Sequence, residues 1–402
     1  MQGKYEMTGM KQSDIAVIGA GPVGLAMARA LASLQVSTVL IDPATPAHLA
    51  QPPNDGREIA LTHASRALLE QLGVWSHLPS SVIFPLRLAN VIDGCSPCVL
   101  RFAPDPAQGQ NLGWLVPNAH LRQASWRAIA AQAHLDLQLG KALEQIRYGS
   151  DGMFLQLSDG QTYHTRLLIV ADGRRSPTRQ LLGIGAQMRL LGQQMLLCRM
   201  QLEYPAAQTA LQWFQYGQTV AILPLAEQLA GVVLTLPSDQ IASLRAIEPS
   251  RFNQHVTELY QRRFGQMMLA SERYVSPLLV SYAETFYAQR AALIGDAAVG
   301  MHPMTAHGYN FGLRSVVRLV AQLRAAIHAQ HDIGDAGHLS AYARQHRLAT
   351  YPLYRATLAI ASVYARHGAS SRLLRPLILR AAQGATPFRR AVAAQLTRAS
   401  AW

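Results

Sequence analysis

Three glycines near the start of the chain, Gly19, Gly21 and Gly24, have the spacing of a site for the diphosphate of a dinucleotide. Gly19 permits a tight turn out of a strand, Gly21 lets the backbone approach the diphosphate, and Gly24 lets the next helix pack on the sheet. The diphosphate would lie at the helix N-terminus, where unpaired N–H groups favour an anion. Asp42 follows Gly24 by 18 residues, a distance at which a carboxylate binds ribose hydroxyls. These residues predict dinucleotide binding and leave open whether the ligand is NAD or FAD.

The flanking segments have the patterns of the elements that would position this motif. Residues 15–18 form a short apolar strand, residues 25–34 are helix formers, and residues 37–41 form a second apolar strand. This order predicts the βαβ unit of a parallel sheet. The later pattern predicts helices near 63–72, 118–134, 250–265 and 309–329, strands at 153–158, 166–171, 197–203, 219–223 and 291–294, and several helices after 338.

Two later segments each place an aspartate beside a glycine at the end of a predicted strand. Residues 167–179 contain an apolar run followed by Asp172 and Gly173, and residues 290–313 contain another run followed by Gly295 and Asp296. Together with the glycine motif, in this order, they resemble the three fingerprints of the single-component FAD-dependent aromatic hydroxylases typified by para-hydroxybenzoate hydroxylase. The resemblance covers residues 14–320 and implies that the cofactor is FAD.

Within that family the chain is most similar to the branch that hydroxylates ubiquinone precursors, including the demethoxyubiquinol hydroxylases. The matching stretches are Asp-Gly-Arg at 55–57, Leu-Gly-Val-Trp at 72–75, Trp-Phe at 213–214 ahead of Ile-Leu-Pro-Leu at 222–225, and His-Pro at 302–303. An arginine-rich helical C-terminal extension is also common in this branch.

The resemblance implies roles for particular residues. Asp296 would accept a hydrogen bond from a hydroxyl of the FAD ribityl chain. Gly308 would precede a helix whose positive N-terminus faces the flavin and stabilises its anionic reduced form. Arg57 and Arg122 match arginines that contact FAD in relatives. The further cofactor contacts would be Asp172, Gly173, Pro303, His307 and Asn310, and the substrate pocket would include Trp213 and Pro303.

Three positions depart from the pattern of this branch. Val299 stands where a histidine is usual, His307 where a glutamine is usual, and Ser315 where an aspartate is common. His307 is therefore the candidate catalytic residue, either as a charged partner of the flavin edge or as a residue that only fills space and caps the helix. These departures bear on which ring carbon is hydroxylated.

The predicted fold is α/β, with a doubly wound Rossmann-like FAD-binding domain, an inserted β-sheet substrate domain and a helical C-terminal region. Residues 1–12 would form a flexible tail. The FAD-binding domain would comprise residues 13–75, 101–185 and 275–335, the substrate domain residues 76–100 and 186–274, and the basic helical region residues 336–402.

Cysteine content and hydropathy predict a cytoplasmic protein. The chain of 402 residues has three cysteines, too few for a disulfide framework, and it has neither a signal-peptide pattern nor an uncharged apolar stretch long enough to span a bilayer. Cys95 and Cys98 form a C-x-x-C pair without a second pair, so a loop with two thiols is favoured over a metal or redox site. The predicted metal content is none.

Positive charge is concentrated at the C-terminal end. The formal net charge is +13, and the residues after Asp335 include ten arginines and no acidic residue. Such a segment predicts binding to an anionic membrane surface, since Phe388, Val392 and Leu396 would share one helical face with arginines beside it. The alternative is a solvated basic face. Binding to nucleic acid is ranked lower because aromatic residues for base stacking are scarce there.

The resemblance implies an FAD-dependent monooxygenase that acts on a polyprenylated phenol or demethoxyubiquinol-like ring. NAD(P)H or another donor would reduce the flavin, O2 would form a C4a-hydroperoxyflavin, and the ring would be hydroxylated ortho or para to its hydroxyl. Participation in a ubiquinone-biosynthesis assembly is also implied. The competing hypotheses are a hydroxylase of another phenol, a flavin-dependent isoprenoid reductase, a disulfide-type reductase and a non-catalytic scaffold that retains FAD. A second glycine motif, which the disulfide-type reductases need, is not visible.

Overall fold

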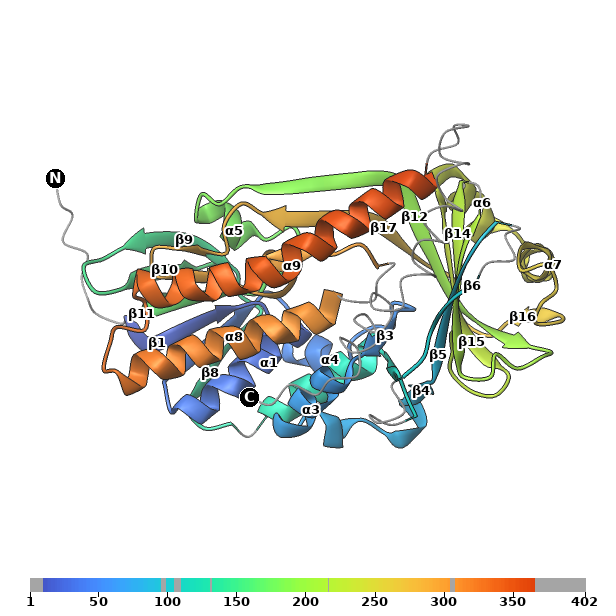
Figure 1. Ribbon diagram of the computed structural model, residues 1–402. Helices are drawn as coiled ribbons and strands as arrows, with labels where there is room; N and C mark the ends of the chain where they lie inside the picture. Colours follow the sequence, from blue (N-terminus) through green and yellow to red (C-terminus); the bar gives the residue numbers. More distant parts are fainter. Residues whose placement is uncertain are drawn as a thin grey trace.

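The computed structural model describes residues 10–94, 99–104, 110–130, 132–215, 217–303 and 308–365 (Figure 1). Cys95, Cys98 and His307 lie outside the described residues, as does the segment 366–402, which includes Phe388 and most of the predicted basic region. The expectations for these residues therefore remain predictions.

The first sheet is the parallel sheet that the glycine motif predicted. Strands β19, β11, β1, β2 and β8 lie side by side in that order, all parallel, and β18 pairs antiparallel at one edge. Their central residues, such as Ile15, Ala16 and Val17, are fully buried in one apolar core. The bounds are β1 Lys11–Ile18, β2 Thr38–Asp42, β8 Leu135–Leu139, β11 Thr162–Val170, β18 Tyr287–Ala288 and β19 Ala291–Leu293, with β9 Leu143–Tyr148 and β10 Met153–Leu157 forming a ribbon beside β11.

Helices α1, α4 and α8 pack together beside the first sheet, and α9 runs along α8 towards the second sheet (Figure 1). Apolar residues of α1 and α8, such as Leu25 and Leu319, are fully buried in the same core as Val17 of the central strand. The helices are α1 Pro22–Leu31, α2 Pro46–Ala50, α3 His63–Gln71, α4 Asn118–Ile129, α5 Pro177–Leu181, α6 Ser238–Ala246, α7 Pro249–Leu259, α8 Gly308–His328 and α9 Ala336–Ala365, with short turns η1 Ala32–Leu34, η2 Trp75–His77, η3 Ser80–Val82 and η5 Gly295–Ala297.

The second sheet has nine strands and lies at the other end of the molecule (Figure 1). Its order is β20, β17, β12, β15, β14, β13, β5 and β6, with β16 paired to β12. Helices α6 and α7 cover one of its faces over a second apolar core that includes Phe252 and Trp213. The bounds are β5 Leu88–Asp93, β6 Val99–Phe102, β12 Ala186–Leu202, β13 Thr209–Gln215, β14 Gln218–Pro224, β15 Leu229–Pro237, β16 Met267–Leu269, β17 Tyr274–Ala283 and β20 Val299–Gly300.

A small sheet joins the two halves. Strand β7 (Gly113–Pro117) pairs antiparallel with β3 (Glu58–Leu61) on one side and with β4 (Phe84–Leu86) on the other. Its strand β3 begins directly after Arg57, one of the predicted cofactor residues. The small sheet therefore places the segment 57–60 between the parallel sheet and the nine-stranded sheet.

Several observed elements cross the predicted domain boundaries. Strand β1 begins at Lys11, inside the predicted tail, because Lys11 and Gln12 pair with β11. Strand β17 pairs with β12, so residues 275–283 lie in the nine-stranded sheet rather than with the FAD-binding segments where the sequence placed them. Strand β6 spans the boundary predicted after residue 100. The remaining division of the chain into domains stays a proposal.

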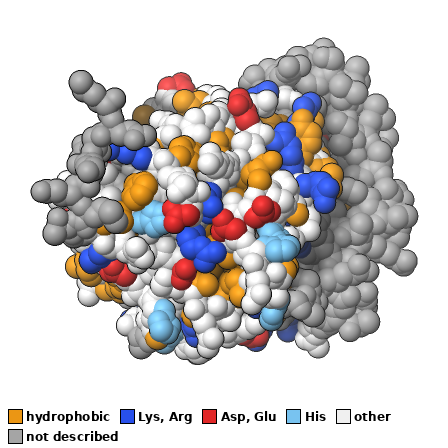
Figure 2. Space-filling view, turned by 90° about the vertical axis from the view of Figure 1, so that its left-hand side faces the viewer, with side chains coloured by type: hydrophobic (Ala, Val, Ile, Leu, Met, Phe, Trp, Pro, Cys, Tyr) orange, Lys and Arg blue, Asp and Glu red, His pale blue; other side chains and the backbone are white. Residues whose placement is uncertain are grey.

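The end of the molecule near the start of β1 and the loop after α8 carries acidic and basic side chains side by side (Figure 2). Asp332 lies 2.6 Å from Arg290 and 3.5 Å from Arg166, and Arg166 also lies 3.5 Å from Asp14. These ion pairs balance charge at this end, which lies opposite the nine-stranded sheet.

Candidate active site

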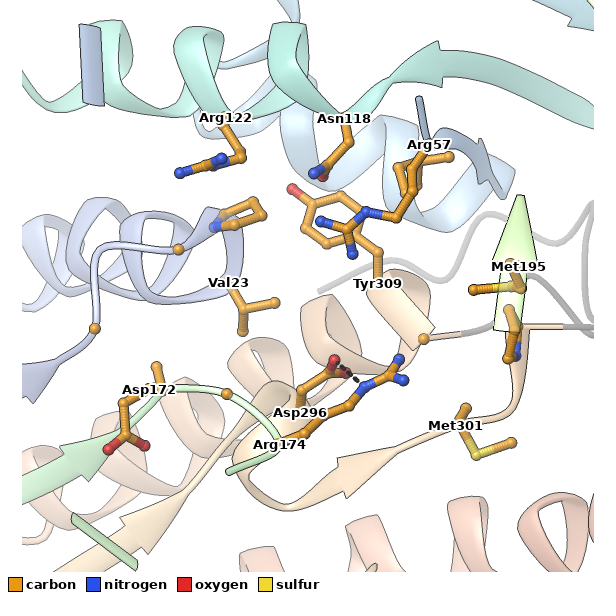
Figure 3. A pocket seen from close by; sticks show the side chains of 18 of the residues that line it. Val23, Arg57, Asn118, Arg122, Asp172, Arg174, Met195, Asp296, Met301 and Tyr309 are labelled. Atoms are coloured by element: carbon orange, nitrogen blue, oxygen red, sulfur yellow. Dashed lines mark hydrogen bonds and ion pairs between the residues drawn. The ribbon is translucent and has the colours of Figure 1, made fainter. Parts of the chain in front are cut away.

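A cavity of about 810 Å³ extends from the glycine motif to the nine-stranded sheet (Figure 3). One half is lined by the carboxyl ends of β1, β2 and β11 and by the start of α8, and the other half by one face of β12, β13, β14 and β15. Ligands of open α/β sheets bind at the carboxyl ends of parallel strands. The cavity therefore combines a nucleotide-binding edge with a separate sheet surface.

The three glycines of the motif serve different geometric needs. A Cβ on Gly19, whose φ is +108°, would lie 2.6 Å from the carbonyl oxygen of Ala171, and a Cβ on Gly24 would lie 1.9 Å from that of Gly19. These two positions must be glycine because backbone approaches backbone. A Cβ on Gly21 would meet no atom within 4 Å, and Gly21 lines the cavity. Gly21 therefore keeps the cavity wall open to a ligand.

Asp42 fixes the loop that carries these glycines. One carboxylate oxygen accepts a hydrogen bond from the Ala20 amide at 2.5 Å and the other accepts from the Ala44 amide at 2.7 Å. Asp42 lines the cavity at the carboxyl end of β2. The structure thus places it where the ribose was predicted.

The Asp-Gly motif lies in the loop between β11 and α5. Asp172 accepts a hydrogen bond from the Thr178 amide at 3.1 Å, while its second oxygen is buried and has no hydrogen-bond partner among the described residues. Burial raises the pKa of this carboxyl, and the hydrogen bonds from Ser176 and Thr178 oppose the effect. Gly173 follows with a φ of +90° and also lines the cavity.

Asp296 forms an ion pair that the sequence did not predict. Its carboxylate lies 2.8 Å from Nε of Arg174 (Figure 3). Arg174 also donates to the carbonyl of Leu279 on β17. Both residues of the pair line the cavity. Nearby His302 is buried, and burial together with the charge of Arg174 lowers its pKa to about 4. His302 is therefore neutral at pH 7.

Arg57 is oriented by a local acidic partner. Its Nε donates to Asp55 at 2.8 Å, and Asn118 of α4 donates to the same carboxylate oxygen at 2.7 Å. Although burial alone would raise it, the pKa of Asp55 is lowered because Arg57 and Asn118 stabilise the charged form. Arg57 and Arg122 both line the upper wall of the cavity (Figure 3), so α4 and the segment before β3 bring together the two arginines that the sequence singled out.

The start of α8 is held by Asn310. Its side-chain oxygen accepts from the Thr62 amide at 3.1 Å and from the Ser65 hydroxyl at 2.7 Å, and its side-chain nitrogen donates to the Ala60 carbonyl at 2.8 Å. The side chain therefore positions the helix rather than facing the cavity. Gly308, Tyr309 and Pro303 line the cavity at this point.

These residues fit FAD. Gly21 opens the wall at the N-terminus of α1, where a diphosphate is favoured, and two arginines line the opposite side. Asp172 offers a buried oxygen that has no hydrogen-bond partner in the described part of the chain, and α8 presents its N-terminus to the cavity. The donors and acceptors thus match a dinucleotide with a flavin at the α8 end.

The substrate half of the cavity has an apolar floor. It is formed by alternate residues of the central strands, including Met195, Leu197, Phe214, Leu223 and Val233, and its far edge carries Gln193, Thr219 and Thr235.

Trp213 does not belong to this floor, and the expectation that it lines the pocket is corrected. Side chains alternate along a strand, so Gln212 and Phe214 face the cavity while Trp213 faces the core under α7. Trp213 is 1% exposed and donates from Nε1 to the Gly94 carbonyl. Pro303, the other residue predicted for the substrate pocket, does line the cavity.

Sequence reasoning missed three buried groups around the site. Arg179 is 1% exposed and donates to the carbonyls of Arg174 and Ala297, which ties the two aspartate motifs together. Ser315, noted only as a departure, accepts from the Gly295 amide at 3.1 Å. Glu58 pairs with Arg199 of the nine-stranded sheet. For Arg179, the signal in the sequence was its position seven residues after Asp172, in the same segment as the Asp-Gly motif.

Comparison with known families agrees with the site. Residues 12–350 match the family described as FAD binding domain. The chain is 38% identical to ubiquinone hydroxylase UbiM of Neisseria meningitidis over 96% of this chain and 84% of that protein. It is 32% identical to ubiquinone hydroxylase UbiL of Rhodospirillum rubrum, over 94% and 88%. It is 30% identical to the 3-demethoxyubiquinol 3-hydroxylase of Escherichia coli, over 77% and 78%.

Solved structures share the fold. The p-nitrophenol 4-monooxygenase PnpA of Pseudomonas putida superposes with a TM-score of 0.76 at 16% identity, covering 96% of this chain and 98% of that one. PqsL of Pseudomonas aeruginosa, titled a probable FAD-dependent monooxygenase, gives 0.71 at 18% identity, covering 88% and 96%. At these identities the likeness concerns the α/β architecture with its second sheet.

Proposed function

Because the chain belongs to the FAD-binding-domain family of flavin-dependent monooxygenases, and within it to the ubiquinone hydroxylases, we propose that it hydroxylates the ring of a polyprenylated ubiquinone precursor. The substrate is a phenol of the demethoxyubiquinol type, and the oxidant is O2. NAD(P)H or another reduced donor supplies the electrons. FAD is the cofactor, and when bound it supplies electron transfer and oxygen activation.

The single observation that carries this proposal is the continuity of the cavity. It joins the cofactor edge of the parallel sheet to an apolar floor formed by residues such as Leu197 and Phe214. An aromatic ring with a prenyl chain is mostly apolar and fits such a surface, because burial of apolar area stabilises its binding.

The residues of this chain perform binding, orientation and exclusion of water. The glycine motif and Arg57 would hold the diphosphate of FAD, and the N-terminus of α8 would stabilise negative charge on the reduced cofactor. Neutral His302 and the apolar floor leave few groups that could bring water to the reacting ring.

The test uses the purified holoprotein with a short-chain demethoxyubiquinol analogue, a reduced donor and ¹⁸O2. We expect one labelled oxygen atom in the product, with donor oxidation stimulated by the analogue. Donor oxidation without any labelled product, for this and for related prenylated phenols, would contradict the proposed reaction.

We also propose that the protein binds an anionic membrane surface through α9 and the residues that follow it. Leu348 is 71% exposed on α9, and Tyr351 and Ile360 are exposed on the same helix beside the exposed Arg344 and Arg355. Apolar side chains flanked by arginines suit the interface of an anionic bilayer. No helix among the described residues is long and apolar enough to cross a membrane. Contact with the bilayer would bring the cavity, which Ala361 of α9 also lines, to a lipid-soluble substrate.

Co-sedimentation with liposomes of rising anionic-lipid content tests this surface. Binding should weaken with salt, and it should fall in Leu348→Glu, in Ile360→Glu and after deletion of residues 371–402. Met268→Glu, at an exposed methionine on β16 rather than on α9, is the matched control. If the full-length protein ignores anionic liposomes at low salt, the membrane proposal fails.

A further inference from the structure

Glu58, the first residue of β3, has a buried carboxylate where the two halves of the cavity meet. Its side chain is 3% exposed, and the residue lines the cavity. Arg199 of β12 approaches it with two nitrogens: Nε donates at 2.9 Å and Nη2 lies at 2.8 Å, and both contacts are to the same oxygen, Oε1. The second oxygen, Oε2, is buried and has no hydrogen-bond partner among the described residues.

An unpartnered carboxylate oxygen in a buried place is costly, so it indicates a missing donor. Burial raises the pKa of Glu58, and the adjacent charge of Arg199 opposes this effect, while the charge of Asp55 adds to it. The guanidinium holds the carboxylate at Oε1, and among the residues that the structure describes none donates a hydrogen bond to Oε2.

The surroundings define what kind of donor would fit. Leu197 and Arg199 lie on the same face of β12, and the Cβ that Gly231 lacks would lie 3.1 Å from Cγ of Glu58 and 3.6 Å from Cβ of Leu223. The carboxylate therefore lies at the edge of the apolar floor, and the missing side chain of Gly231 leaves room for it. A flat apolar ring that carries a hydroxyl on its rim matches this arrangement.

We propose that Oε2 of Glu58 accepts a hydrogen bond from the ring hydroxyl of the substrate, with Arg199 as the residue that positions the carboxylate. This inference rests on the proposed function, since it names the group that binds the phenol of that reaction. A charged acceptor draws the proton away from the ring oxygen and enriches the ortho and para carbons in electrons. It also fixes which of these carbons faces the cofactor.

The experiment compares two ligands on the holoprotein by calorimetry: 2-prenylphenol and its methyl ether, 2-prenylanisole. In the ether a methyl group replaces the hydroxyl proton of the phenol, so the ether has no O–H to donate. We expect the phenol to bind roughly 10–100-fold more tightly, the range of a hydrogen bond to a charged group. Equal affinities, or binding of neither ligand, would overturn the assignment.

Variants then locate the effect. In Glu58→Gln the amide oxygen satisfies Arg199 and the second position becomes an N–H donor, so the preference should fall to about threefold or less. Glu70→Gln, in the exposed Arg66–Glu70 pair, is the matched control and should keep the wild-type preference. Gly231→Ala displaces the carboxylate without removing its charge and should also reduce the preference, even if the Gln variant does not fold.

Two outcomes separate the alternatives. If the Glu58→Gln variant still binds the phenol more tightly than the ether, with or without loss of FAD, then Glu58 does not bind the ring hydroxyl. A wild-type protein that shows the preference but incorporates no ¹⁸O would refute the proposed reaction and leave Glu58 assigned as a phenol-binding group.

Discussion

At the scale of single residues, the glycine motif separates folding from cofactor binding. Gly24 packs against the carbonyl of Gly19, whereas Gly21 borders open cavity. The same type of substitution should therefore have different effects at the two positions.

Gly24→Ala should destabilise the protein by about 2–3 kcal/mol or more, because its Cβ would lie 1.9 Å from a backbone oxygen that cannot move freely. Gly21→Val should leave stability nearly unchanged and abolish FAD retention by blocking approach of the diphosphate. Urea unfolding of the FAD-free proteins and flavin absorbance of the purified proteins measure the two effects. A Gly21→Val protein with full flavin content would contradict this account.

His346 should make stability depend on pH. It is 1% exposed, accepts from Arg318 at 2.8 Å, and has a pKa lowered to about 3 by burial and by the charges of Arg318 and Arg314. The unfolded chain takes up a proton below its ordinary pKa of about 6.5, and the folded protein does not do so until about pH 3. Stability should thus fall as pH decreases through this window.

Below pH 6, the free energy of unfolding should fall by about 1.4 kcal/mol per pH unit because of His346. His302 should add to this slope down to about pH 4. His346→Gln, which keeps an acceptor for Arg318, should flatten the slope. Urea unfolding at pH 7 and pH 5 measures it. An unchanged slope in the variant would show that another group titrates.

At the scale of elements, Asn310 connects α8 to β3 and α3 through one amide that both accepts and donates. Asn310→Asp should weaken FAD binding by at least about tenfold and cost about 2–3 kcal/mol, because a carboxylate oxygen would face the Ala60 carbonyl. Asn253→Asp is the matched control, since within the described residues the Asn253 side chain uses its oxygen alone, as acceptor from the Leu269 amide. Fluorescence titration with FAD measures the affinity, and equal losses in both variants would refute the role of Asn310.

Two tyrosines of α9 test how this helix is fastened to the sheets. The hydroxyl of Tyr342 donates to the Leu293 carbonyl of β19 at 2.6 Å, whereas the buried hydroxyl of Tyr354 has no hydrogen-bond partner among the described residues. Tyr342→Phe should cost about 1–2 kcal/mol, and Tyr354→Phe should be neutral or stabilising. Chemical unfolding compares them; a larger loss in Tyr354→Phe would contradict the assigned contacts.

At the scale of the whole molecule, strands β12 and β17 connect the two halves. Residues 186–190 of β12 pair with 279–283 of β17 next to the parallel sheet, and after a change of register at Gly192 residues 194–197 pair with 274–277 in the nine-stranded sheet. The two halves therefore share a continuous ribbon, and we expect them to unfold in a single transition.

The sequence predicted the parts of the fold that depend on local pattern. The glycine motif, the helix after it and the helix that begins at Gly308 are encoded by neighbouring residues and were predicted correctly. The partners of Asp296 and Glu58 were not predictable, since Arg174 and Arg199 approach them from distant segments. The face of Trp213 was predicted wrongly because a two-residue period does not say which face meets the cavity.

The position of β19 in the parallel sheet has a consequence for synthesis on the ribosome. The first half of the dinucleotide site is complete once β2 has been made, but β19 and α8 follow roughly 250 residues later. At about 5–20 residues per second, this delay is roughly 10–50 s. In the later part of that time, after β11 has been made and before β19 follows, the nascent chain exposes an unfinished sheet edge beside β11. Ribosome-bound chains that end before residue 290 should therefore be unable to retain the flavin and should be good substrates for chaperones that recognise open strand edges.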